Sequence, residues 1–141
     1  MEMVITFGLT VFMAAMSVPY YQRYVLNTNL KAAARDIASD FANLKQRAMT
    51  ESTNFSILFN VGDNSYTLQQ GGAALQVKAP SSFAKDIAIV SAPYGSGTTI
   101  TFLTRGIVQQ AGSVTLSNRL GSMATISTNI SGKTDVQFTF R

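Results

Sequence analysis

Apolar residues fill the start of the chain almost without interruption. Between Glu2 and Arg23 lies an uncharged, mostly apolar run of twenty residues, Met3 to Gln22. A helix of that length is about 30 Å long, enough to cross the hydrocarbon core of a membrane. The sequence therefore predicts an apolar helix over residues 1–24, which needs lipid or other protein around it.

After residue 24 the apolar positions recur every three or four residues, which is the period of an amphipathic helix. This stripe consists of Leu30, Ala34, Ile37, Phe41, Leu44 and Ala48. Charged residues, Asp36 and Asp40 among them, fall mostly off it. Because no Gly or Pro interrupts residues 20–53, we expect one helix ending at about Ser52. Residues 25–53 are then its amphipathic continuation, packed on the rest of the chain.

From Asn54 onward the apolar period changes to two, which is typical of β-strands. Phe55, Ile57 and Phe59 alternate with mostly polar residues, and residues 62–64 turn the chain into a second strand. Further strand candidates are Ile87–Ser91, Thr99–Leu103, Ser113–Ser117, Met123–Ser127 and Asp135–Phe140, separated by turn formers. Residues 71–85 read as a loop or a poorly paired strand.

The predicted fold is therefore α+β. A long N-terminal helix packs by its C-terminal half on an antiparallel β-sandwich or sheet formed by residues 54–141. The chain contains no linker rich in Gly or Pro between the helix and the β-domain, so we expect the two to form one body.

Composition removes most enzyme chemistry. The 141 residues include no Cys and no His, so thiolate catalysis, disulfides and the commonest general base and metal ligand are excluded. The glycine-rich segment 95–99 lacks the lysine of a phosphate-binding loop. We expect no catalytic residues, no metal and no cofactor.

The net charge of +4 is too small to predict nucleic-acid binding by itself. The basic residues of the β-domain are scattered, and they read mainly as a solvated surface. A DNA-binding track is the alternative. These residues are Lys78, Lys85, Arg105, Arg119 and Lys133.

Three readings of the N-terminal run remain open: a cleaved signal peptide, a plain single-span anchor, and a helix that also assembles with copies of itself. A signal peptide has a basic start, whereas this run starts with an acid. A plain anchor leaves two residues unexplained. Glu2 is costly in lipid unless it is paired, and Pro19 removes a backbone donor inside the helix.

The same residues resemble the N-terminal helix of type IV pilins and type II secretion pseudopilins. In that superfamily an acid near the mature N-terminus precedes an apolar helix that ends in Ala-Ala-x-x-x-Pro-x-Tyr-x-x-Tyr. Here the acid is Glu2, and residues 14–24 carry the motif with Pro19, Tyr21 and Tyr24 in place. The resemblance covers about 25 residues and implies the pilin fold.

A second resemblance narrows the branch. Residues 34–48 of the helix are similar to the GspH/FimT-type minor pilins and pseudopilins, and so, more loosely, are residues 100–106, 112–118 and 130–133. The sequence departs from the family's pattern at the N-terminus and within the helix. The resemblance implies further residues before Glu2, and Val11 replaces the family's common helix glycine, with Gly8 one turn earlier.

The resemblance implies a structural subunit that waits in the bacterial inner membrane and then polymerises. Glu2 would neutralise the terminal amine of a neighbouring subunit. Tyr21 and Tyr24 would either pack in the filament wall or, with Tyr20, anchor at the headgroup level of the membrane. Pro19, Ser17 and Gly8 would let the helix stretch or melt locally. The partners would be copies of the same chain and the assembly machinery of a pilus or secretion system.

The resemblance leaves the type of filament open: a major or minor pilin, or a pseudopilin of a type II secretion system. A DNA-uptake minor pilin is the rival function, with Lys133 as a weak DNA contact. FimT-type DNA-binding proteins carry Gly-Arg-x-Arg near the C-terminus, whereas this chain has an acid, Asp135, at the second arginine. A carboxylate there repels phosphate, so the sequence favours an assembly role.

Overall fold

The structure is a computed structural model that describes residues 2–82 and 84–141, without the side chains of residues 2, 4 and 14–19. One helix, α1, spans Glu2–Glu51. The strands that follow are β1 (Phe55–Asn60), β2 (Ser65–Gln70), β3 (Ala73–Lys78), β4 (Ala88–Ser91), β5 (Thr99–Phe102), β6 (Gly112–Ser117), β7 (Met123–Thr128) and β8 (Thr134–Thr139), with a short 3-10 turn, η1 (Pro80–Ser82), before β4.

The helix α1 is continuous and, at 1.5 Å per residue, about 75 Å long. Its backbone is helical through position 19, although proline cannot donate the hydrogen bond of that turn. The helix ends next to Ser52, which adopts a left-handed conformation with φ of 50° and turns the chain toward β1. The predicted end near Ser52 is confirmed.

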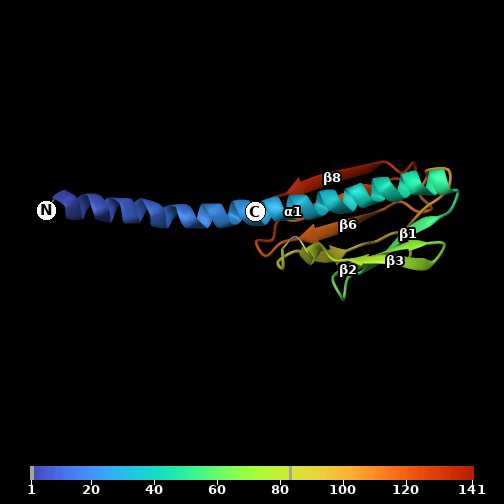
Figure 1. Ribbon diagram of the computed structural model, residues 1–141, viewed down its shortest axis with the longest axis horizontal. Coiled ribbons are helices and arrows are strands. Elements are labelled where there is room, and N and C mark those ends of the chain that lie inside the picture. The colour runs from blue at the N-terminus through green and yellow to red at the C-terminus, as the bar shows by residue number, and fades with distance from the viewer. Residues whose placement is uncertain (1, 83) are drawn as a thin grey trace.

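The strands form two antiparallel four-stranded sheets, one in the order β3-β2-β1-β5 and the other in the order β4-β6-β7-β8. The C-terminal half of α1 lies along this β-domain, whereas its N-terminal half projects away from it (Figure 1). The helix packs mainly against β7 and β8 and also contacts β1. The predicted α+β fold is therefore confirmed.

The core lies where the amphipathic half of α1 meets both sheets. The helix contributes buried Leu30, Ala33, Ala34, Ile37, Phe41, Leu44 and Ala48. Phe41 is central, because its ring lies 6.2 Å from that of Phe59 in β1 and 5.8 Å from that of Phe102 in β5. Burying one such side chain stabilises the fold by roughly 1.5–3 kcal/mol. No helix residue before Leu30 is buried among the described side chains.

The side chain of Asn64 connects the β1–β2 turn of one sheet to the edge strand β4 of the other. Asn64 ends the turn between β1 and β2, with a left-handed φ of 49° that asparagine tolerates. Its Nδ2 donates to the carbonyl of Ile87, and its Oδ1 accepts from the amide of Ile89, both at 2.8 Å. The side chain thereby pairs with β4 as a neighbouring strand would.

Segment 71–85 had two predicted alternatives, a loop or a poorly paired strand, and the structure shows a strand over Ala73–Lys78. β3 pairs with β2 over Ala73–Lys78, with a register shift between Leu68 and Gln69, and η1 follows it. β3 lies at a sheet edge and is exposed on both faces, Val77 at 65% for example. A strand exposed on both faces has no apolar alternation, which is why the pattern could not distinguish it from a loop.

Candidate functional site

The projecting half of α1 presents large apolar side chains on every side. Among the described side chains these are Met3, Ile5, Phe7, Leu9, Val11, Phe12 and Met13, each more than half exposed. Phe7, for example, is 75% exposed. A contiguous apolar surface of this kind marks a site of contact with protein or lipid, because water disfavours it strongly.

The threonines of this segment bond to the helix backbone. Thr10 Oγ1 donates to the carbonyls of Thr6 and Phe7, at 2.8 and 3.0 Å, and Thr6 Oγ1 donates to the carbonyl of Met3 at 3.1 Å. Hydroxyl groups bonded in this way can enter apolar surroundings without an unmet partner. The surface of the projecting half of α1 is therefore effectively apolar at Thr6 and Thr10 as well.

Several predicted assembly residues lie outside the described side chains, namely Glu2, Ser17 and Pro19. Gly8 is described, and a Cβ added there would meet no atom within 4 Å. Within this chain, therefore, packing does not require glycine at position 8. Within the described residues, no helix combines the length and the mean hydropathy of a membrane span.

Three tyrosines mark the level at which α1 leaves the β-domain, the neck of the molecule. Tyr20, Tyr21 and Tyr24 are all at least 70% exposed. Tyr21 also borders a half-open pocket of about 280 Å³ that contains Val25, Leu26 and Arg119 of the β6–β7 turn. The predicted packing role of Tyr21 and Tyr24 stays a prediction, because it concerns a neighbouring subunit.

A polar cluster attaches the helix to the β2–β3 hairpin. Asp40, only 7% exposed, accepts hydrogen bonds from Tyr66 Oη at 3.0 Å and from Lys78 Nζ at 2.8 Å. Asp36 adds a weaker contact to each, at 3.3 Å to Tyr66 and 3.7 Å to Lys78. The expectations that Asp40 lies off the packed face and that Lys78 is solvated are therefore wrong.

The cluster shifts the protonation of both donors. Burial and the negative charge of Asp40 raise the pKa of Tyr66 above its ordinary value. Burial lowers the pKa of Lys78, but the hydrogen bond and the charge of Asp40 outweigh this, so its pKa is also raised. Both groups therefore keep their protons at neutral pH and hold the Asp40 carboxylate between them.

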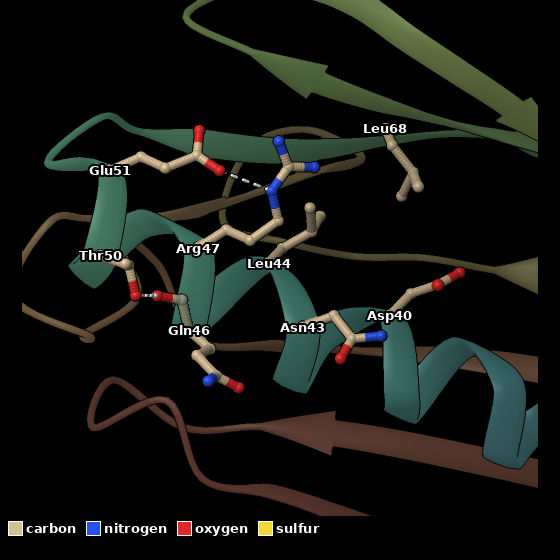
Figure 2. Close-up of a pocket in the computed structure, with 8 residues that line it drawn as sticks. All are labelled: Asp40, Asn43, Leu44, Gln46, Arg47, Thr50, Glu51 and Leu68. Atoms are coloured by element: carbon tan, nitrogen blue, oxygen red, sulfur yellow. Dashed lines mark hydrogen bonds and ion pairs between the residues drawn. The ribbon is translucent and has the colours of Figure 1, made fainter.

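A shallow groove of about 410 Å³ lies beside the last turns of α1 (Figure 2). Its lining residues are Asp40, Asn43, Leu44, Gln46, Arg47, Thr50, Glu51 and Leu68. Arg47 extends toward Glu51, with 2.8 Å between Nε and Oε1, and its guanidinium lies 4.7 Å from the ring centre of Phe55.

This groove lacks the geometry of an active site. Asp40 and Glu51 lie at its opposite ends (Figure 2). They are eleven positions apart on one helix, about 16 Å along its axis, which is too far for two carboxylates to act on one bond. Within the described residues no group of three or more potential metal-ligating side chains occurs. The groove therefore offers surface for contact and no catalytic constellation.

Solved structures identify the fold. A structure of the minor pseudopilin EpsH from the type 2 secretion system of Vibrio cholerae matches 78% of this chain and 97% of its own, with a TM-score of 0.61 and 10% identity. The fold is therefore that of this minor pseudopilin. A second EpsH structure gives a TM-score of 0.62 at 9% identity, over 78% of this chain and 96% of its own. No family model and no curated protein matches the sequence.

Within the pseudopilin fold, Lys133 occupies the turn between β7 and β8. Its amide donates to Asn129 Oδ1 at 3.0 Å, and Lys45 Nζ donates to the neighbouring Gly132 carbonyl at 3.2 Å. Lys133 and Asp135 are both exposed. Their opposite charges, two positions apart, reduce the attraction of this turn for phosphate.

The Asp40 cluster is the feature of this pseudopilin fold that sequence reasoning missed. One signal was present: Asp36 and Asp40 are four residues apart and therefore share a helix face, and Asp40 directly precedes Phe41 of the stripe. An acid at the border of a buried stripe needs a partner. The sequence could not predict which residue this partner is. The partner, Lys78, lies at the end of the edge strand β3, which the pattern did not distinguish from a loop.

Proposed function

We propose that this chain is a structural subunit, a pilin or pseudopilin, that polymerises through its N-terminal helix into a type IV pilus-like filament. One observation carries the proposal. A helix half with exposed apolar side chains on every side is joined without a break to a fully packed domain of pseudopilin fold. Packing against identical helices removes that apolar surface from water.

Before assembly the same surface needs lipid, so the proposal includes a stage in the bacterial inner membrane. Residues 3–22 are uncharged and, as a helix, about 30 Å long. The bonded hydroxyls of Thr6 and Thr10 suit both lipid and a helix bundle. Lipid tails and apolar helices are similar solvents, so the transfer between them has a modest net free energy.

Glu2 provides specificity in this scheme. Its carboxylate pairs with the terminal amine of a neighbouring subunit, because an unpaired charge in the filament core carries a large desolvation penalty. Pro19, with Ser17 and Gly8 nearby, loosens the helix locally as subunits enter the filament. Tyr21 and Tyr24 pack against neighbouring subunits at the neck.

The filament is extracellular for a pilus and periplasmic for a pseudopilus. Its partners are copies of the chain and the assembly machinery. Similarity to EpsH, a minor pseudopilin, favours a minor subunit of a secretion pseudopilus. The rival function, DNA uptake, has less support because Asp135 accompanies Lys133. Catalysis is not part of the proposal.

Substitution of Glu2 tests the assembly mechanism. We expect Glu2→Ala to leave membrane insertion intact, measured as resistance of the full chain to alkaline extraction, and to abolish filaments seen by electron microscopy. Glu51→Ala is the matched control, since Glu51 is a surface acid at the other end of the same helix. Normal filaments from the Glu2→Ala chain would disprove the role of Glu2.

The solution behaviour of the chain tests the proposal as a whole. We expect the purified full chain to require detergent or lipid, and to form filaments or soluble oligomers when the detergent is removed. A monodisperse monomer in plain buffer would contradict the proposal, because the exposed apolar half of α1 would then be stable in water.

A further inference from the structure

Basic residues gather around the neck of the molecule. Arg23 lies on the exposed surface of α1, and Lys31 lies two turns further along, over the ring of Phe140 at 4.8 Å. Arg119 projects from the β6–β7 turn into the neck pocket beside Tyr21. We call Arg23, Lys31 and Arg119 the basic collar.

The collar is held at this level by the adjoining turn. Asn118, directly before Arg119, donates to Asn27 Oδ1 of α1 at 3.0 Å. Asn27 lies midway between Arg23 and Lys31, which are about 12 Å apart along the helix. The three cations therefore lie within a stretch of about 12 Å along the helix axis.

Acidic residues do not neutralise these cations. The sequence has no acid between Glu2 and Asp36, and Asp36 already contacts Lys78. The ion pairs of the described residues involve Arg47 and Lys78 and none of the collar.

The pocket at the collar combines an apolar wall with a charged rim. Val25 and Leu26 are half-buried and form its wall, while Tyr21 and Arg119 border it. Its volume of about 280 Å³ admits a small polar headgroup with the start of an acyl chain. Tyrosine and basic side chains together are typical of the headgroup level of membrane proteins.

We propose that the basic collar binds the headgroups of anionic phospholipids and thereby fixes the β-domain against the membrane before assembly. This inference rests on the membrane stage of the proposed function. The collar directly follows the uncharged segment along α1. This position favours lipid headgroups, rather than acidic side chains of a second copy of the chain, as the partner of its cations. Residues 3–22 match the hydrocarbon thickness, so Arg23, the next residue, falls at the phosphate level.

Lipid retention by the full chain tests the collar. The chain is held in neutral detergent micelles with equal amounts of phosphatidylglycerol and phosphatidylcholine, and the bound lipids are counted by native mass spectrometry. Each basic residue at an anionic surface contributes roughly a five-fold preference. We expect wild type to prefer phosphatidylglycerol, and the Arg23→Gln/Arg119→Gln variant to lose about ten-fold or more of that preference.

The matched control is Arg105→Gln/Lys133→Gln, which removes two exposed cations near Met49, about 39 Å along α1 from Arg23. We expect it to retain the wild-type preference. An equal preference in wild type and the collar variant, or an equal loss in the control, would overturn the proposal. So would a collar variant that keeps its lipid preference but forms no filaments, because the cations would then pair with another subunit.

The two proposals fail separately. A chain that selects phosphatidylglycerol through the collar but never forms filaments leaves the collar standing and contradicts the filament function. A chain that forms filaments without any lipid preference contradicts only the collar.

Discussion

Asn118, in the turn between β6 and β7, donates a hydrogen bond from Nδ2 to Oδ1 of Asn27 on α1, 3.0 Å away. The Oδ1 of the same side chain accepts from the amides of Leu120 and Ser122, at 3.0 and 3.1 Å. One buried side chain therefore shapes the turn and attaches it to the helix. This contact defines where the packed part of α1 begins.

Removal of this side chain should weaken the neck. We expect Asn118→Ala to lower the free energy of unfolding by about 2–3 kcal/mol, since three hydrogen bonds of about 1 kcal/mol each are lost at a buried site. Thermal unfolding of the full chain in neutral detergent measures the effect. Asn43→Ala is the control, because Asn43 is an exposed asparagine of the same helix. Equal stability of the two variants would show that the Asn118 contact contributes nothing.

The Asp40 cluster makes a second prediction. Tyr66→Phe removes a hydrogen bond to a buried carboxylate, and such bonds contribute roughly 1.5–3 kcal/mol to stability. We expect a loss of that size by denaturant unfolding. Tyr24→Phe, at a 71% exposed tyrosine, should change stability by less than about 0.5 kcal/mol. A loss confined to Tyr24→Phe would contradict this account.

The close approach of the loops that contain Gly106 and Gly132 leads to a third prediction. Gly132 has φ of +72°, and a Cβ there would lie 2.7 Å from the carbonyl oxygen of Gly106. Gly71 has a similar φ of +56° but open space around it. We expect Gly71→Ala to lose about 1–2 kcal/mol from backbone strain alone. Gly132→Ala should lose clearly more in the same unfolding assay, and equal losses would mean that the loops separate freely.

Alkaline pH should destabilise the fold. Burial raises the pKa of Tyr66 and of Tyr94, and the pKa of Lys78 is raised as well. These groups lose protons near pH 10 when unfolded but keep them when folded, so their contribution is complete below about pH 10 and decreases above it. We expect denaturant unfolding to show a falling free energy of unfolding above that pH, by up to about 1.4 kcal/mol per pH unit per group.

The same titration with Tyr66→Phe provides the internal check. Because one of the three groups is then missing, the decrease above pH 10 should be less steep. A slope equal to that of wild type would mean that Tyr66 ionises as readily in the folded as in the unfolded chain.

Most of the architecture followed from periodicity, since the apolar stripe of residues 30–48 and the alternation from Phe55 onward are strong local signals. β3 was only one of two predicted alternatives, because Leu75 and Val77 are exposed and leave no one-sided pattern. The burial of Asp40 was missed for a different reason. Its partners Tyr66 and Lys78 are 26 and 38 residues away, and only the packed hairpin brings them to the helix.

The surface of the projecting helix has a mechanical consequence. Its described side chains from Met3 to Met13 include no charge, and its threonine hydroxyls turn back to the backbone. A helix with so uniform a surface offers no position-specific contacts along its length. Neighbouring helices of this kind can therefore slide past one another with little change in free energy. In the proposed filament, the axial alignment of the subunits must then be set where the helix segment ends, at its tip and at the neck beside Asn27.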